Sequence, residues 1–281
     1  MFGNCQAYAM GRCLRTLLPD SEITALNWGE LGSDAHIEGF AKSLERFDVL
    51  VAQPARPPEL RRLDPEALAA VPARCVFFPA VQFTGFQPDA VRRSGDGLVS
   101  LVGEWHSALI MAAWRMGLPE ARAEELFNAY IYGALGYFDE HAKASQFLLE
   151  QASKLGWDLS AELRAWPAPF VHTPNHPRIG VMMDLARGLC ARLGLDPGPH
   201  APPPPDPFAP LGAWPIYPEI GKRLGVAGEM SFVNVVESGR TYPLDEAIAW
   251  YYAVYDKAPP EALAAVDRVD EVIAMLRAEG V

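Results

Sequence analysis

The sequence predicts an α/β protein that is predominantly helical, with a small N-terminal parallel sheet of the Rossmann-like kind and a large helical region. The first observation is the alternation of short apolar runs with helical patterns over the first hundred residues, which is typical of a parallel sheet with crossover helices. The second is the hydrophobic spacing from Gly103 onward, which is mostly helical. With 281 residues, 50% of them hydrophobic, the chain can bury a sizeable core.

The N-terminal part is expected to alternate strands and helices. The expected strands are residues 1–3, 22–28, 48–52 and 75–79, and the expected helices are 6–18, 35–47 and 65–70. Cys5, Gln53 and the segment after Pro79 each follow one of these strands, and ligands collect beyond the carboxyl ends of parallel strands. The first strand is so short that a native start upstream of Met1 stays open.

The rest of the chain is expected to be helical, apart from an ordered, proline-broken loop at 78–89. The expected helices are 105–116, 119–130, 141–155, 179–193, 244–255 and 260–279. Four parts are expected to form one compact unit: an α/β part (1–100), a helical part (101–195), a proline-rich excursion (196–215) and a C-terminal helical part (216–281).

Composition narrows the classes of function. The formal net charge of -11 argues against a general nucleic-acid binder, which needs a basic face. We expect a cytoplasmic protein with no membrane span, because we find neither a signal peptide nor an apolar run long enough to cross a bilayer. The four scattered cysteines resemble neither a zinc site nor a disulfide framework, so reduced thiols are expected.

Cys5 and His176 are the candidate catalytic residues. Cys5 stands between Asn4 and Gln6 where a helix is expected to begin, and the positive end of a helix favours thiolate, the nucleophilic form. His176 lies between Asn175 and Pro177 and offers a general base, with Asn175 to orient its ring. The simpler alternatives are a small apolar core residue at position 5 and a loop histidine at position 176.

Other polar residues are weaker candidates. The amides of Asn4, Gln6 and Gln53 can donate hydrogen bonds to a developing oxyanion. His106 is expected on an apolar helix, where a lone histidine is more often a buried core residue. A metal site is not expected, because Pro174 separates His172 from His176 and no cysteine or carboxylate accompanies them. The candidates for a substrate or cofactor pocket are Gln82, Gly85, His106, His172 and Arg178.

Five short motifs occur in one order along the chain. They are Gly3-Asn4-Cys5-Gln6, Gln53-Pro54, 83–89, 135–138 and 173–177. In this order they resemble the WcbI-type polysaccharide-biosynthesis enzymes. The resemblance implies an acetyltransferase that uses coenzyme A in capsular polysaccharide synthesis. It also implies a largely helical fold in which the cysteine and the histidine, here Cys5 and His176, face each other.

The resulting hypothesis is a coenzyme A-dependent O-acetyltransferase that acts on a sugar or polysaccharide precursor. Its co-substrate would be acetyl-CoA, its acceptor a carbohydrate, and no metal or nucleic acid is expected. Covalent transfer through Cys5 and direct transfer with His176 alone both stay open. The alternatives are a hydrolase that uses the same Cys/His pair on an ester or amide, and a non-catalytic carbohydrate-binding protein.

Overall fold

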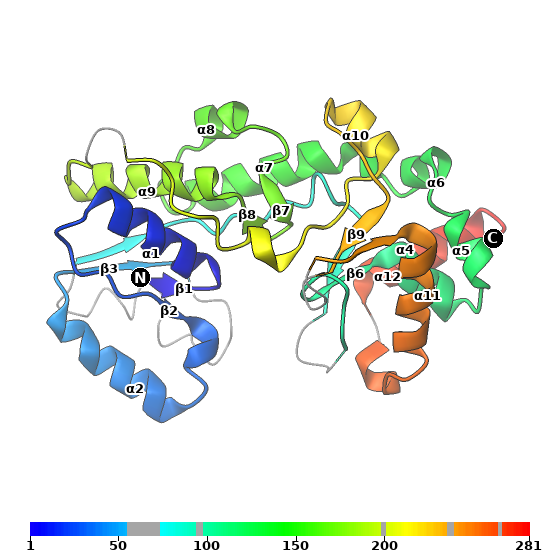
Figure 1. Cartoon of the computed structure of the whole chain (residues 1–281), viewed down its shortest axis with the longest axis horizontal. Coiled ribbons are helices and arrows are strands. Elements are labelled where there is room, and N and C mark those ends of the chain that lie inside the picture. Colours follow the sequence, from blue (N-terminus) through cyan, green and yellow to red (C-terminus); the bar gives the residue numbers. More distant parts are fainter. Residues whose placement is uncertain (55–73, 94–97, 198–200, 235–238, 264–265) are drawn as a thin grey trace. The chain divides into compact units, whose positions relative to one another are not determined.

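The structure, a computed structural model, describes residues 1–54, 74–93, 98–197, 201–234, 239–263 and 266–281 (Figure 1). The chain divides into two compact units. Unit 1 comprises Met1–Val81, Phe147–Phe170 and His176–Pro207, and unit 2 comprises Gln82–Gln146, Val171–Asn175 and Phe208–Val281. The boundaries differ from those of the four expected parts, because the chain leaves unit 1 soon after the last strand of its parallel sheet and returns twice. The expectation of one compact unit stays a prediction.

Unit 1 contains a parallel four-stranded sheet in the order β2-β1-β3-β4, which confirms the expected N-terminal sheet. Its strands are β1 (Phe2–Gly3), β2 (Leu26–Asn27), β3 (Val49–Ala52) and β4 (Arg74–Phe77). The second strand is much shorter than the expected 22–28. The side chain of Asn27 accepts the N–H of Gly29 and caps a 3-10 helix, η1 (Trp28–Glu30), which ends the extended backbone.

Helices cover both faces of this sheet. Figure 1 shows α1 (Gln6–Leu17) and α9 (Ile179–Leu193) above it and α2 (Asp34–Ser43) below it. Phe2 is fully buried in the lower layer and stacks on Phe40 of α2, with ring centroids 4.7 Å apart. The expected helix at 35–47 is α2 followed by a 3-10 turn, η2 (Leu44–Arg46), and the expected helix at 65–70 lies outside the described residues.

Unit 2 is mostly helical and carries two antiparallel strand pairs. The pairs are β5 (Ala90–Arg92) with β6 (Trp105–Ser107), and β9 (Ser231–Val233) with β10 (Thr241–Pro243). Its helices include α4 (Ala108–Arg115), α5 (Glu120–Glu124), α6 (Ala129–Ala134), α10 (Pro218–Leu224), α11 (Leu244–Tyr255) and α12 (Asp267–Ala278). Helix α4 packs against α11 and α12, and α11 also packs against α5. The chain is therefore the expected, predominantly helical α/β protein.

Two expected helices of unit 2 begin or end elsewhere. The helix expected at 105–116 begins at Ala108, because residues 105–107 pair with β5 and the Oγ of Ser107 accepts the N–H of Ile110 as a cap. His106 therefore lies on a strand and not on a helix. The helix expected at 119–130 is divided into α5 and α6, since the Oδ1 of Asn128 accepts the N–H of Ile131 and begins a new helix.

The remaining expectations agree more closely. Residues 179–193 and 244–255 are helical with the expected bounds, and 78–89 contain no helix or strand. The expected helix at 260–279 is a 3-10 turn, η6 (Pro260–Leu263), followed by α12, with 264–265 outside the described residues. The other elements are η4 (Tyr137–Asp139), α7 (Glu140–Ser153), α8 (Ser160–Ala165), β7 (Val171–Thr173), β8 (His176–Pro177) and η5 (Ala209–Leu211). Within the described residues we find no helix with the length and apolar character needed to cross a bilayer.

A buried carboxylate, Asp89, connects distant parts of unit 2. It is 0% exposed, and its Oδ1 accepts the N–H of Leu109 and the hydroxyl of Tyr137, both at 2.9 Å. Its Oδ2 accepts the hydroxyl of Tyr217 at 2.6 Å, and Ser107 bonds to it as well. Burial raises the pKa of Asp89, and the four hydrogen bonds act in the opposite direction. One side chain thus ties α4, η4 and the segment before α10 together.

We expect Asp89→Ala to lower the free energy of unfolding by about 3 kcal/mol or more, because it leaves several buried donors without an acceptor. Urea unfolding measures the change. Asp256→Ala is the matched control, since this exposed carboxylate accepts one hydrogen bond from Trp114 and its loss should cost less than about 1 kcal/mol. Equal losses in the two variants would contradict a central role for Asp89.

Candidate active site

Cys5 lies in the turn that joins β1 to α1, directly before Gln6, the first residue of the helix. Asn4 supplies the cap of this helix. Its Oδ1 accepts the N–H of Gln6 at 2.8 Å, and its backbone oxygen accepts the N–H of Ala7 at 2.9 Å. Cys5 is partly exposed. The expected strand-to-helix turn is therefore present, and the cap does not use the thiol.

The side-chain amides of two buried glutamines fix the conformation of this turn through hydrogen bonds. Gln6 and Gln53 are both 0% exposed, and the Nε2 of Gln53 donates to the Oε1 of Gln6 at 3.2 Å. The Gln6 amide also exchanges two hydrogen bonds with the backbone of Val81, at 2.8 and 3.0 Å. The Oε1 of Gln53 accepts the N–H of Asn4 at 3.0 Å. A Cβ on Gly3 would lie 2.6 Å from that oxygen, so a larger residue there would displace the Gln53 amide from its hydrogen bonds.

His176 begins β8, is half-buried and belongs to the same unit as Cys5. Pro177 follows it and has no N–H. The N–H of Arg178 donates to the backbone oxygen of Phe170 at 2.8 Å, and α9 begins at Ile179. The imidazole therefore stands three residues before the start of α9.

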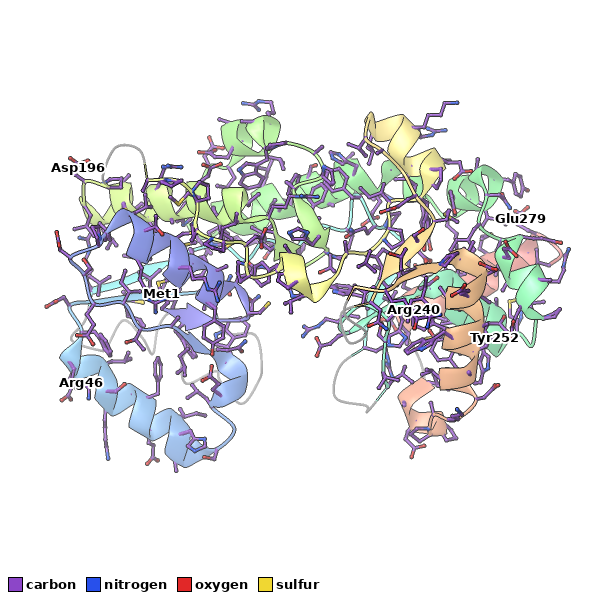
Figure 2. The ribbon with its side chains drawn as sticks, in the orientation of Figure 1. Met1, Arg46, Asp196, Arg240, Tyr252 and Glu279 are labelled. Carbon is purple, nitrogen blue, oxygen red and sulfur yellow. The ribbon has the colours of Figure 1, made fainter. Side chains whose placement is uncertain are left out.

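Helices α1 and α9 bring the two candidates to the same end of unit 1. The helices pack against each other, and Figure 1 shows them running side by side in the same direction. Figure 2 labels Asp196 past the far end of α9. Asp184 and Arg187 of α9 are among the charged groups that act on the thiol of Cys13 in α1. Each candidate lies just before the start of one of these two helices. Their parallel direction supports the prediction that the two side chains converge.

The other three thiols lie in environments that disfavour thiolate. Burial raises the pKa of Cys13 to about 12 and that of Cys75 to about 11, and it also raises the pKa of Cys190. Cys13 and Cys190 are 0% exposed. These residues fit the description of small apolar core residues better than that of nucleophiles.

Asn175 and His172 belong to unit 2. The Oδ1 of Asn175 accepts hydrogen bonds from the indole of Trp105, at 3.2 Å, and from the hydroxyl of Thr173, at 3.1 Å. The backbone oxygen of His172 accepts the amide of Gln87 and the N–H of Trp214. Both residues therefore fasten the segment before His176 to unit 2.

His106 is a core residue of unit 2. It is 0% exposed, and its Nδ1 lies 3.1 Å from the hydroxyl of Tyr255. Burial, assisted by Arg93, lowers the pKa of His106 to about 3, so the ring is neutral at physiological pH. This agrees with the alternative of a buried core histidine.

The remaining pocket candidates differ in their packing and exposure. Gly85 is required by packing, because a Cβ there would lie 2.6 Å from the ring of Phe83 and 2.7 Å from the Cα of His141. Gln82 is half-buried and Arg178 is exposed. Their assignment to a substrate or cofactor pocket stays a prediction.

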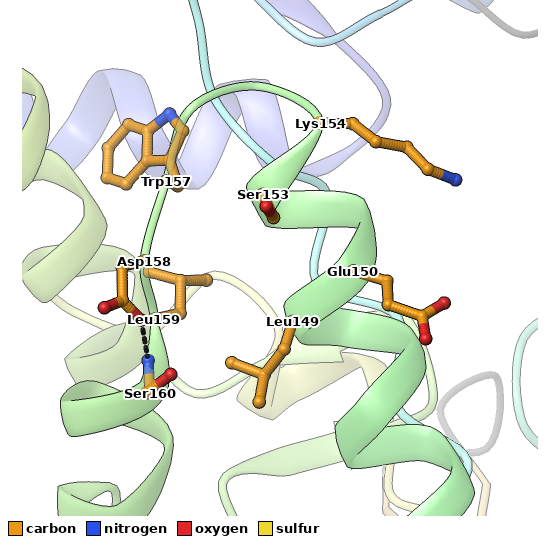
Figure 3. Close-up of a pocket in the computed structure, with 8 residues that line it drawn as sticks. All are labelled: Leu149, Glu150, Ser153, Lys154, Trp157, Asp158, Leu159 and Ser160. Atoms are coloured by element: carbon orange, nitrogen blue, oxygen red, sulfur yellow. Dashed lines mark hydrogen bonds between the residues drawn. The ribbon is translucent and has the colours of Figure 1, made fainter.

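A cavity of about 660 Å³ lies between the end of α7 and the start of α8 (Figure 3). Figure 3 shows Leu149 and Leu159 at its centre, while Glu150 and Lys154 point away from it. Its other lining residues are Ser153, Trp157, Asp158 and Ser160. None of its lining residues carries a thiol or an imidazole, so it offers no nucleophile–base pair. Among the residues that the structure describes, we find no group of histidine, cysteine or acidic side chains that could hold a metal ion.

One charged residue near the candidate site, Asp206, was not among those predicted from the sequence. The Oδ2 of Asp206 accepts the N–H of Ile179 at 3.0 Å, at the start of α9. The one signal in the sequence is an isolated carboxylate between two prolines, which alone does not indicate a partner.

Comparison with known proteins identifies the family. A family model described as the polysaccharide biosynthesis enzyme WcbI matches residues 1–198. A solved structure is similar over 99% of this chain and 96% of its own, with a TM-score of 0.75 and 14% sequence identity. It is described as WcbI, a polysaccharide biosynthesis enzyme, in its native form without the disulfide bond between coenzyme A and a cysteine. No curated protein matches the chain. Because the family model covers more than two thirds of the sequence, the chain belongs to the family of WcbI polysaccharide-biosynthesis enzymes.

Proposed function

We propose that this chain is a coenzyme A-dependent O-acetyltransferase that acts on a sugar or polysaccharide precursor. The observation that carries the proposal is the position of Cys5 directly before α1, in a turn that buried amides hold. A partly exposed thiol at the positive end of a helix is suited to nucleophilic attack on a thioester. The solved WcbI structure, described as the native form without a disulfide bond between coenzyme A and a cysteine, supports coenzyme A as the ligand.

Transfer through Cys5 proceeds in two steps. His176 accepts the proton of the Cys5 thiol, and the thiolate attacks the acetyl carbonyl of acetyl-CoA. The C–S bond to the coenzyme breaks, its thiolate takes the proton from the His176 imidazolium, and acetyl-Cys5 forms. In the second step His176 accepts the proton of the sugar hydroxyl, whose oxygen attacks acetyl-Cys5. The acetyl ester forms, and the released Cys5 thiolate takes the proton back.

The supporting residues have three different roles. Asn4 is half-buried, and the helix cap uses its amide oxygen, so its amide nitrogen is our candidate donor to the oxyanion. Gln6 and Gln53 are fully buried and bond to each other, to Val81 and to Asn4. We therefore assign them to holding the turn and not to the oxyanion. Asn175 acts through the backbone of the segment that carries His176.

Incubation with acetyl-CoA should label the protein with one acetyl group per chain, detectable by mass spectrometry of the intact protein. Cys5→Ala should abolish the label and lower the rate of transfer, because the acyl acceptor is lost. Cys75→Ala is the matched control and should keep both. Transfer at the normal rate in Cys5→Ala would exclude the covalent route.

Coenzyme A and acetyl-CoA should each raise the melting temperature, because a ligand that binds the native state stabilises it by about 2.7 kcal/mol at a hundredfold excess over Kd. Simple esters should leave the melting temperature unchanged. A thermal-shift series with these compounds makes the comparison. Ester hydrolysis without any coenzyme effect would instead favour a Cys/His hydrolase.

Iodoacetamide at pH 7 should modify Cys5 first. The pKa values of Cys13 and Cys75, at about 12 and about 11, keep these thiols protonated at this pH, and the pKa of Cys190 is raised as well. Peptide mapping after brief labelling of the native protein identifies the modified residue. Preferential labelling of Cys75 would count against an activated thiol at position 5.

A further inference from the structure

The N-terminus of α9 is capped by a residue that lies far along the chain. The residue before the helix, Arg178, makes no side-chain cap within the described structure. The carboxylate of Asp206 fills this role, because its Oδ2 accepts the N–H of Ile179 at 3.0 Å. A carboxylate at the start of a helix satisfies an unpaired N–H and is favoured by the helix dipole.

The carboxylate of Asp206 belongs to a proline-rich segment. Pro202 to Pro205 precede Asp206, and Pro207 follows it. Residues 201–206 adopt neither helix nor strand, and proline fixes φ at every position but one in 202–207. Such a segment loses little conformational entropy when it is held in place. Asp206 also acts on the thiol of Cys13 in α1, so it lies close to both helices of the α1–α9 pair. The expected surface excursion is therefore part of unit 1 up to Pro207 and contacts its helices.

This contact lies next to the candidate base. Two consecutive backbone N–H groups follow Pro177. That of Arg178 donates to the backbone oxygen of Phe170, and that of Ile179 donates to Asp206. The backbone directly after His176 is thus held by two hydrogen bonds, one of which comes from the proline-rich segment.

We propose that Asp206 is a positioning residue for His176, delivered to the start of α9 by the proline-rich segment as a remote cap. The role in catalysis rests on the proposed function, whereas the effect on the imidazole does not. Without the carboxylate, the first turn of α9 loses an anchor and the ring of His176 is free to leave its catalytic position.

The test compares Asp206→Ala with Asp206→Asn. Asp206→Ala should shift or broaden the NMR signals of the His176 ring and lower kcat of acetyl transfer about tenfold, with a much smaller effect on KM for acetyl-CoA. Asp206→Asn keeps an acceptor for the N–H of Ile179 and should retain the ring signals and most of kcat. Asn128→Ala is the matched control, since it removes a helix cap in unit 2 and should leave both readouts unchanged.

Pro205→Gly provides a second variant in case Asp206→Ala does not fold. It loosens the segment but keeps the carboxylate, and it should change the ring signals and kcat in the same direction by a smaller amount. Unchanged His176 signals in both variants would overturn the proposal, whatever happens to the melting temperature. If the wild-type protein shows no acetyl transfer, the proposed function fails, while the ring signals still decide whether Asp206 positions His176.

Discussion

The site depends on the hydrogen bonds that the buried amides of Gln6 and Gln53 make to each other, to Val81 and to Asn4. Strand β1 has only two residues, and its last ladder bond to β3 is the one from the N–H of Gln53 to the oxygen of Phe2, at 2.9 Å. Beyond that point the side chain of Gln53 replaces the neighbouring backbone and accepts the N–H of Asn4. A very short strand can therefore end in a well-defined turn. The fit of glycine at position 3 has the same origin, because the Gln53 amide oxygen occupies the space of a side chain.

Burial divides the four thiols of the chain into two kinds. Cys13 of α1 and Cys190 of α9 are fully buried, and Cys75 lies on an edge strand of the sheet. Desolvation disfavours the charged form of all three. Cys5, in contrast, is partly exposed and lies directly before the N-terminus of α1. The candidate nucleophile thus lies directly before a helix that contains an inert thiol, Cys13.

In unit 2, buried polar side chains form hydrogen bonds within the core. Asp89 and His106 are both fully buried, and their partners are tyrosines from distant parts of the chain. Burial keeps His106 neutral, so it adds no charge to the core. Buried polar groups with such specific partners, Asp89 above all, favour one arrangement of the core over others, because other arrangements would separate them from these partners. The segment that precedes His176 is fastened to this rigid frame through Asn175.

The sequence by itself determined the class of the fold, the turn at Cys5 and the helix that follows His176, because hydrophobic period, glycine and proline are local signals. It also suggested the family, through motifs whose order is visible without coordinates. It could not determine that His106 lies on a strand, since the pairing of 105–107 with Ala90–Arg92 is a contact between distant residues. Nor could it distinguish the buried amides of Gln6 and Gln53 from exposed donors, or find the partner of Asp206. Those assignments depend on which backbone groups meet in three dimensions, and only the tertiary structure decides that.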